Sequence, residues 1–280
     1  MNKPSILFIG GAWHGAWVWQ PLSRALLDHH LLSVAFDLPG AGTLAPREYT
    51  LSGQAVAKKH LPEQSLVANI TFDDRFVQLE RQLISLYQAT QNPVVIIAHS
   101  IGGLFASELM EKHTEKICSA IFINGYMLLD QQSAADFLVM PCMSNYKVGQ
   151  ILAEDYSKIQ ATRIAVGLSD SDYNHHLREI LYGDISDDRF ECALHNLHTD
   201  EPLTLFDKKI SISKERFGSV NRHYISSKYD LAVPLEAQKY MVDVMDQWSL
   251  TSTTVHTIAT GHSPMISNHQ KLSEIIASIV

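Results

Sequence analysis

Short apolar runs alternate along the chain with longer segments of helical periodicity. Runs with the character of buried strands lie at residues 5–9, 32–36, 94–98, 117–123, 220–225 and 253–258. Apolar residues recur at helical spacing in segments 17–28, 72–87 and 101–112. Continuous apolar strands separated by helices are typical of a parallel sheet that is covered on both faces. The pattern therefore predicts an α/β fold with a mostly parallel central sheet flanked by helices.

Two segments interrupt this alternation. Residues 43–70 are polar with little periodicity, which predicts either a loop excursion or the margin of a lid. Residues 126–205 show helical patterns at 170–181 and 187–197 but no strong strand. We interpret residues 126–205 as a helical cap inserted between two strands of a single domain that spans residues 1–280.

Composition and charge exclude several classes of protein. The 280 residues are 46% hydrophobic and 19% charged, which is the balance of a globular protein with a large core. A net charge of −8 provides no basic surface for nucleic acid or for an anionic membrane. The first apolar run is too short for a signal peptide, and none reaches the ~18 residues of a membrane-spanning helix. We therefore expect a soluble, cytoplasmic protein with no nucleic-acid or membrane partner.

The three cysteines, Cys118, Cys142 and Cys192, lie far apart in the sequence. An odd number without a C-x-x-C spacing fits neither a disulfide framework nor a zinc site. We expect these side chains to be small apolar residues of the core, and we expect no metal site.

Ser100 lies between a buried strand and a helix in the sequence VVIIAHSIGG, residues 94–103. A serine at such a sharp turn needs small residues two positions before and after it, here Ala98 and Gly102. Its hydroxyl then projects above the sheet, at the positive end of the following helix. Ser100 is therefore the predicted nucleophile.

A nucleophilic serine needs a base, and the base needs an acid that orients it. His262 follows the last predicted strand and precedes the terminal helix, whereas most other histidines fall on polar helical faces. Asp230 follows the strand at 220–225, at the sheet edge where α/β active sites gather. Asp230 could also cap the helix that begins near Pro234. The chain order Ser100, Asp230, His262 favours the catalytic interpretation.

An acyl-transfer enzyme also needs two N–H donors for the oxyanion. Ile101 follows the nucleophile, and Ala12 lies in the glycine-rich loop GGAWHGAWVW after the first strand, residues 10–19. We predict these two backbone N–H groups as the donors. For the substrate pocket we predict an apolar roof formed by the start of the cap, with these pocket residues: Trp13, Tyr126, Met127, Phe137 and Met140.

Four motifs together resemble the α/β-hydrolase superfamily. They are GAWHGAWVW at residues 11–19, FDLPGAG at 36–42, AHSIGG at 98–103 and GHSP at 261–264. They are most similar to the branch of plant methyl esterases, hydroxynitrile lyases and their bacterial esterase relatives. This resemblance implies Ser100, Asp230 and His262 as the triad, and Ala12 and Ile101 as oxyanion donors. The chain departs from that branch at Gly10-Gly11, where the branch usually has His-Gly.

The expected reaction is hydrolysis of carboxylic esters of small to medium uncharged molecules, without metal or organic cofactor. The partner is then a small-molecule ester or lactone. A lactonase would use the same chemistry and stays an alternative. The lyases of the branch carry a lysine directly after the catalytic histidine, and Ser263 at that position disfavours lyase activity. The alternative from another class is a non-catalytic small-molecule receptor that retains the triad.

Overall fold

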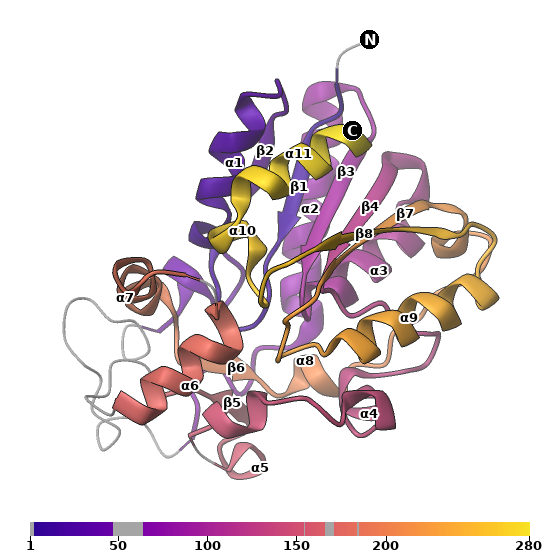
Figure 1. Ribbon diagram of the computed structural model, residues 1–280. Coiled ribbons are helices and arrows are strands. Elements are labelled where there is room, and N and C mark those ends of the chain that lie inside the picture. Colours follow the sequence, from indigo (N-terminus) through magenta and orange to yellow (C-terminus); the bar gives the residue numbers. More distant parts are fainter. Residues whose placement is uncertain (1–2, 47–63, 154, 166–170, 184) are drawn as a thin grey trace.

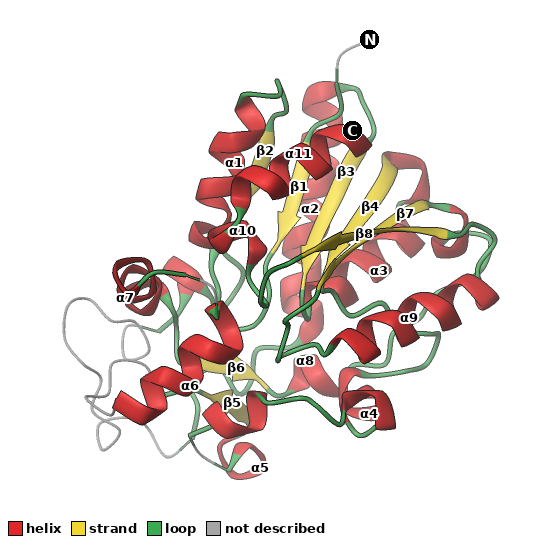
Figure 2. Ribbon diagram, viewed as in Figure 1, coloured by secondary structure: helices red, strands yellow, loops and turns green. Residues whose placement is uncertain are grey.

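The computed structural model describes residues 3–46, 64–153, 155–165, 171–183 and 185–280 (Figure 2). Within them the chain folds around a six-stranded sheet in the order β2-β1-β3-β4-β7-β8, and every neighbouring pair is parallel. The strands are β1 (Ile6–Ile9), β2 (Ser33–Ala35), β3 (Val94–His99), β4 (Ile117–Ile123), β7 (Asn221–Ser227) and β8 (Thr253–Ile258). The predicted parallel sheet is confirmed, with every expected run present as a strand.

Helices cover both faces of this sheet (Figure 1). Helices α1 (Gln20–Leu27), α10 (Pro264–Ser267) and α11 (His269–Ile279) pack on one face, and α2 (Phe72–Thr90), α3 (Gly102–Lys112) and α9 (Leu235–Trp248) pack on the other. The central strands β1, β3 and β4 contribute alternate side chains to the two halves of the core. In β3, for example, Ile96 packs with α2 and α3, whereas Val95 and Ile97 pack with α1 and α11. This double burial explains why these strands are continuously apolar.

Local signals fix both ends of helix α2. Thr71 and Asp74 form a reciprocal capping box, so α2 begins at Phe72 as the periodicity predicts. The helix continues to Thr90 and ends at Gln91, whose left-handed backbone has a φ of 53°.

The segment between β4 and β7 leaves the sheet and lies at the carboxyl ends of its strands (Figure 1). We keep the name cap for residues 126–205; these limits stay a prediction. Its described α-helices and strands are α4 (Ala134–Leu138), α5 (Tyr156–Ile159), β5 (Ala161–Arg163), α6 (Ser171–Tyr182), α7 (Asp187–Asn196) and β6 (Asp200–Pro202), and α8 (Thr204–Asp207) begins at its end.

The cap contains an antiparallel pair of strands that the sequence pattern does not reveal. Strands β5 and β6 are three residues each, too short for an alternating pattern to be visible. A buried ion pair joins them, with Arg163 Nε and Nη2 donating to the two carboxylate oxygens of Asp200 at 2.8 and 2.7 Å.

Part of two predicted segments lies outside the described residues. Of the polar excursion at 43–70, residues 47–63 are not described, and the remainder includes a short 3-10 turn at Gly42–Leu44. The predicted helical start at residue 170 also lies outside, and α6 is described from Ser171.

Our prediction that the cysteines are core residues is wrong for two of them. Cys118 and Cys192 are exposed, whereas the half-buried Cys142 packs against the edge of the core. Among the described helices, none has the length and apolar character needed to cross a bilayer.

Candidate active site

Ser100 occupies a strained turn between β3 and α3. Its φ of 54° is in the left-handed region, which residues other than glycine rarely adopt. Three backbone hydrogen bonds hold it there: the Ser100 N–H donates to Ile123 O (3.2 Å), and Ser100 O accepts from the N–H groups of Tyr126 (2.9 Å) and Gly103 (3.0 Å). The turn is therefore fixed by the strand beside it as well as by the helix that follows.

The small residue two positions after Ser100 is required by close backbone packing. A Cβ atom on Gly102 would lie 2.6 Å from the carbonyl oxygen of Gly10, in the loop after β1. Such a contact is too short for any side chain, so the loop that carries Ala12 can approach Ser100 only over a glycine. Ala98, two positions before Ser100, is fully buried in the core.

Asp230 and His262 form a buried pair at the carboxyl end of the sheet. His262 Nδ1 lies 2.8 Å from Asp230 Oδ2, and both side chains are almost fully buried. The other carboxylate oxygen, Oδ1, accepts from the backbone N–H groups of Ala232 (2.7 Å) and Val233 (2.8 Å). The carboxylate of Asp230 therefore stabilises the turn at residues 230–233 and also orients the imidazole of His262. In that orientation Nδ1 is the protonated nitrogen and Nε2 faces the cavity.

The backbone of His262 is held by two further side chains. His99 Nε2 and Asn124 Nδ2 each donate to the carbonyl oxygen of His262 at 2.9 Å. Asn124 Oδ1 accepts from the N–H of Ser227, three residues before Asp230 (2.9 Å). One buried amide thus ties the aspartate's strand to the histidine's loop.

The sequence pattern did not identify these supports. His99 could have been suspected because it precedes the nucleophile directly. No local signal distinguishes Asn124, whose partners are 103 and 138 residues away in sequence.

Two more histidines close to His262 are kept neutral by burial. Desolvation, with repulsion from His262 acting in the same direction, lowers the pKa of His99 well below its usual value and lowers the pKa of His14 to about 3. The ring centroids of His99 and His262 are 4.5 Å apart. His14 and His99 therefore act as neutral hydrogen-bonding groups beside His262.

A cavity of about 30 Å³ lies at the meeting point of these residues. Its lining includes two of the predicted triad residues, Ser100 and His262, and both predicted oxyanion residues, Ala12 and Ile101. Of the predicted pocket residues, Trp13 and Tyr126 also line it. The structure thus brings together residues from four separate parts of the chain.

The other three predicted pocket residues are placed elsewhere. Met127 and Phe137 are buried in the core with α3 and α9, and the half-buried Met140 packs against the same cluster. Met127 N–H contacts the sulfur of Met241 in α9, which shows that this part of the cap faces the sheet domain. The lining comes instead from later residues of the cap and from the Asp230 turn: Tyr146, Val148, Leu181, Phe206 and Ala232.

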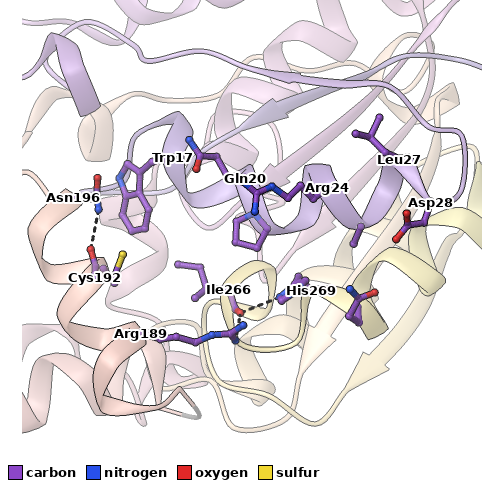
Figure 3. A pocket seen from close by; sticks show the side chains of 14 residues that line it. Trp17, Gln20, Arg24, Leu27, Asp28, Arg189, Cys192, Asn196, Ile266 and His269 are labelled. Atoms are coloured by element: carbon purple, nitrogen blue, oxygen red, sulfur yellow. Dashed lines mark hydrogen bonds between the residues drawn. The ribbon is translucent and has the colours of Figure 1, made fainter.

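A wider surface groove of about 710 Å³ lies between α1, α7 and the α10–α11 segment (Figure 3). Trp17 and Arg24 line one side, and Arg189 reaches across to donate to Ile266 O at 3.2 Å. The groove shares no lining residue with the cavity at Ser100. It contains no member of the triad, so the smaller cavity is the candidate active site.

No metal centre competes for this assignment in the part of the chain that the structure describes. There, no three His, Cys, Asp or Glu side chains are grouped so that they could hold an ion.

The low pKa of His14 predicts acid-sensitive stability. Below the ordinary histidine pKa of 6.5 the unfolded chain binds a proton that folded His14 does not bind until about pH 3. Between pH 6 and 4, the free energy of unfolding of the native protein should therefore fall more steeply than that of His14→Gln, by about 1.4 kcal/mol per pH unit. Urea denaturation at several pH values measures this difference, and parallel curves would contradict it.

Comparison with known proteins places this site in a family. A sequence profile of the alpha/beta hydrolase family matches residues 6–275. Methylesterase 1 of Arabidopsis thaliana is 27% identical over 295 residues, covering 99% of this chain and 96% of the relative. Methylesterase 10 of the same plant is 26% identical over 284 residues, covering 98% and 90%. The chain spans 56% of a third relative, the putative chloroplastic methylesterase 15.

Solved structures share the fold over nearly the whole chain. Polyneuridine aldehyde esterase superposes with a TM-score of 0.73 at 22% identity, covering 99% of both chains. A pyrethroid hydrolase from Sphingobium faniae JZ-2 also has a TM-score of 0.73, at 17% identity, covering 99% of this chain and 96% of that one. The similarity to plant methylesterases that the motifs predicted is confirmed, and the chain belongs to the alpha/beta hydrolase family.

Proposed function

We propose that this protein is a serine hydrolase of carboxylic esters that works through an acyl-enzyme. One observation carries the proposal: Ser100, on a left-handed turn, shares a cavity with His262, whose Nδ1 is held by buried Asp230. The names of relatives support it, since they include methylesterases of Arabidopsis thaliana and a methyl jasmonate esterase of Vitis vinifera that is 23% identical over 291 residues.

In the proposed reaction His262 Nε2 takes the proton of the Ser100 hydroxyl as its oxygen attacks the acyl carbon. Asp230 stabilises the imidazolium that results. His262 then gives its proton to the leaving alcohol, and the acyl group stays on Ser100. Water repeats the sequence, with His262 as base, and releases the acid.

The backbone N–H groups of Ala12 and Ile101 are the proposed donors to the oxyanion of each tetrahedral intermediate. Both residues line the cavity beside Ser100. The Ile101 N–H stands at the beginning of α3, where the helix dipole also favours a developing negative charge.

The lining favours small to medium uncharged substrates. The described residues that line the cavity include no Lys, Arg, Asp or Glu, and burial keeps His14 neutral. Apolar contacts come from Val148, Leu181 and Phe206. A volume of about 30 Å³ holds about two water molecules. Substrate binding therefore requires lining side chains of the cap to move apart.

Replacing the nucleophile tests the proposal directly. Ser100→Ala should lower kcat for p-nitrophenyl butyrate by about 10⁴-fold or more, because triad members act as a unit. A fluorophosphonate should label the native protein and not this variant, whereas Ser273→Ala, a buried serine of α11, should be labelled normally. Retention of more than a tenth of native kcat would show that Ser100 is not the nucleophile. A lack of labelling of the native protein would favour a non-catalytic receptor.

The acid's role is tested by Asp230→Asn. The amide oxygen can still accept from the Ala232 and Val233 N–H groups, so the turn should be retained. The amide NH₂ cannot accept the Nδ1 proton of His262, which favours the wrong tautomer. We expect kcat to fall by about 10⁴-fold with an unchanged circular dichroism spectrum. A fall of less than tenfold would assign the acid to another residue.

Chain-length selectivity tests the substrate proposal. Each acyl methylene that becomes buried should raise kcat/KM by about fourfold, equivalent to ~0.8 kcal/mol, until the cavity is full. Initial rates on p-nitrophenyl esters from acetate to decanoate should rise and then fall. Acyl-homoserine lactones of matching chain length, assayed in parallel, separate an esterase from a lactonase. A flat profile would show that the lining does not select the acyl group.

A further inference from the structure

Trp13, the residue after the proposed donor Ala12, is bonded to the cap through three polar groups. Its backbone N–H donates to Glu201 Oε1 at 2.8 Å, and its indole Nε1 donates to Thr162 O at 3.2 Å. Its carbonyl oxygen accepts from the N–H of His198 at 3.3 Å. Trp13 has a φ of 61°, a strained conformation that persists only where its surroundings enforce it.

The peptide group that joins Ala12 and Trp13 is also held at its carbonyl oxygen. His14 Nδ1 donates to the carbonyl oxygen of Ala12 at 2.6 Å, and His14 Nε2 accepts from the hydroxyl of Tyr182 in α6 at 2.6 Å. The carbonyl oxygen and the N–H of one peptide, adjacent to the donor, are therefore both fixed by a chain of bonds from the cap.

Glu201 is the charged centre of this arrangement. Its carboxylate also accepts from Arg75 Nη1 at 2.7 Å and from His198 Nε2 at 2.8 Å, and all three side chains are buried. Burial alone would raise the pKa of Glu201, but Arg75, His198 and the Trp13 N–H outweigh it and lower the pKa to about 2. The carboxylate is thus ionised at every working pH, and the Trp13 N–H meets a full negative charge.

We propose that Glu201 is a positioning residue for the oxyanion hole. By fixing the Trp13 N–H it sets the orientation of the preceding Ala12 N–H, so that the cap determines how well the transition state is stabilised. A displacement of about 1 Å in such a group can cost up to 10²-fold in rate. The inference rests on the proposed ester hydrolysis and adds to it a residue 101 positions away from the nucleophile.

The neighbouring ion pair offers a comparison within the same two cap strands. Asp200 and Arg163 are as deeply buried as Glu201, and the Asp200 carboxylate accepts from Arg163 and from the hydroxyl of Thr199. These bonds join residues of the cap to one another. The Glu201 carboxylate instead accepts a hydrogen bond from outside the cap, from the Trp13 N–H in the loop that carries Ala12.

A matched pair of double variants separates the acceptor from the charge. Arg75→Met with Glu201→Gln removes both charges but keeps an acceptor for the Trp13 N–H, whereas Arg75→Met with Glu201→Leu removes the acceptor as well. Arg163→Met with Asp200→Asn is the control for loss of a buried ion pair. Steady-state kinetics on p-nitrophenyl butyrate, and inhibition by a trifluoromethyl ketone that forms an oxyanion on Ser100, are measured below the melting temperature of each variant.

We expect the leucine variant to have about tenfold lower kcat than the glutamine variant, with KM within threefold. Its affinity for the trifluoromethyl ketone should fall by about the same factor, since kcat and this affinity both depend on the oxyanion donors. The control pair should keep native kcat wherever it is folded. Equal kcat in the leucine and glutamine variants would overturn the inference. Absence of both hydrolysis and fluorophosphonate labelling in the native protein would instead overturn the proposed function.

Discussion

The site depends on the left-handed backbone of Ser100. A φ of 54° is a strained conformation for serine, so hydrogen bonds from outside the turn must enforce it. Those bonds come from Ile123 and Tyr126, at the end of β4 and the start of the cap. The same turn brings the beginning of α3 against the loop after β1, with Gly102 over the Gly10 carbonyl. The proposed nucleophile, the two proposed N–H donors and the start of the cap are therefore fixed relative to one another by the conformation of this turn.

Electrostatics then restricts where charge can appear. His14 and His99 are buried with lowered pKa values, so they act as neutral hydrogen-bonding groups beside His262. The negative charge of Asp230 is satisfied by two backbone N–H groups and by the imidazole. In the proposed reaction, the proton taken from Ser100 would therefore be stabilised on His262 by Asp230, and the buried surroundings would strengthen that interaction because solvent does not screen it.

The sequence predicted the parts of the molecule whose signals are local. Apolar runs identified each strand of the large sheet. The small residues Ala98 and Gly102 on either side of Ser100 indicated the sharp turn between strand and helix. The Glu201 network was not predictable in this way, since Arg75, His198 and Trp13 converge on it from three separate segments. The roof of the pocket was misplaced for a related reason. Met127 and Phe137 are apolar enough for a pocket or a core, and only the packing of the cap on α9 decides between them.

The bonds between cap and loop constrain how this protein can diverge. Where a lid meets a catalytic domain through apolar contacts alone, the interface tolerates substitutions that conserve volume. Here Thr162, Tyr182, His198 and Glu201 meet the loop after β1 through directional bonds. A lid transplanted from a relative would have to bring partners for the Trp13 N–H and for His14 with it. New substrate ranges are therefore more accessible through substitutions at apolar lining residues such as Val148, Leu181 and Phe206 than through exchange of the whole cap.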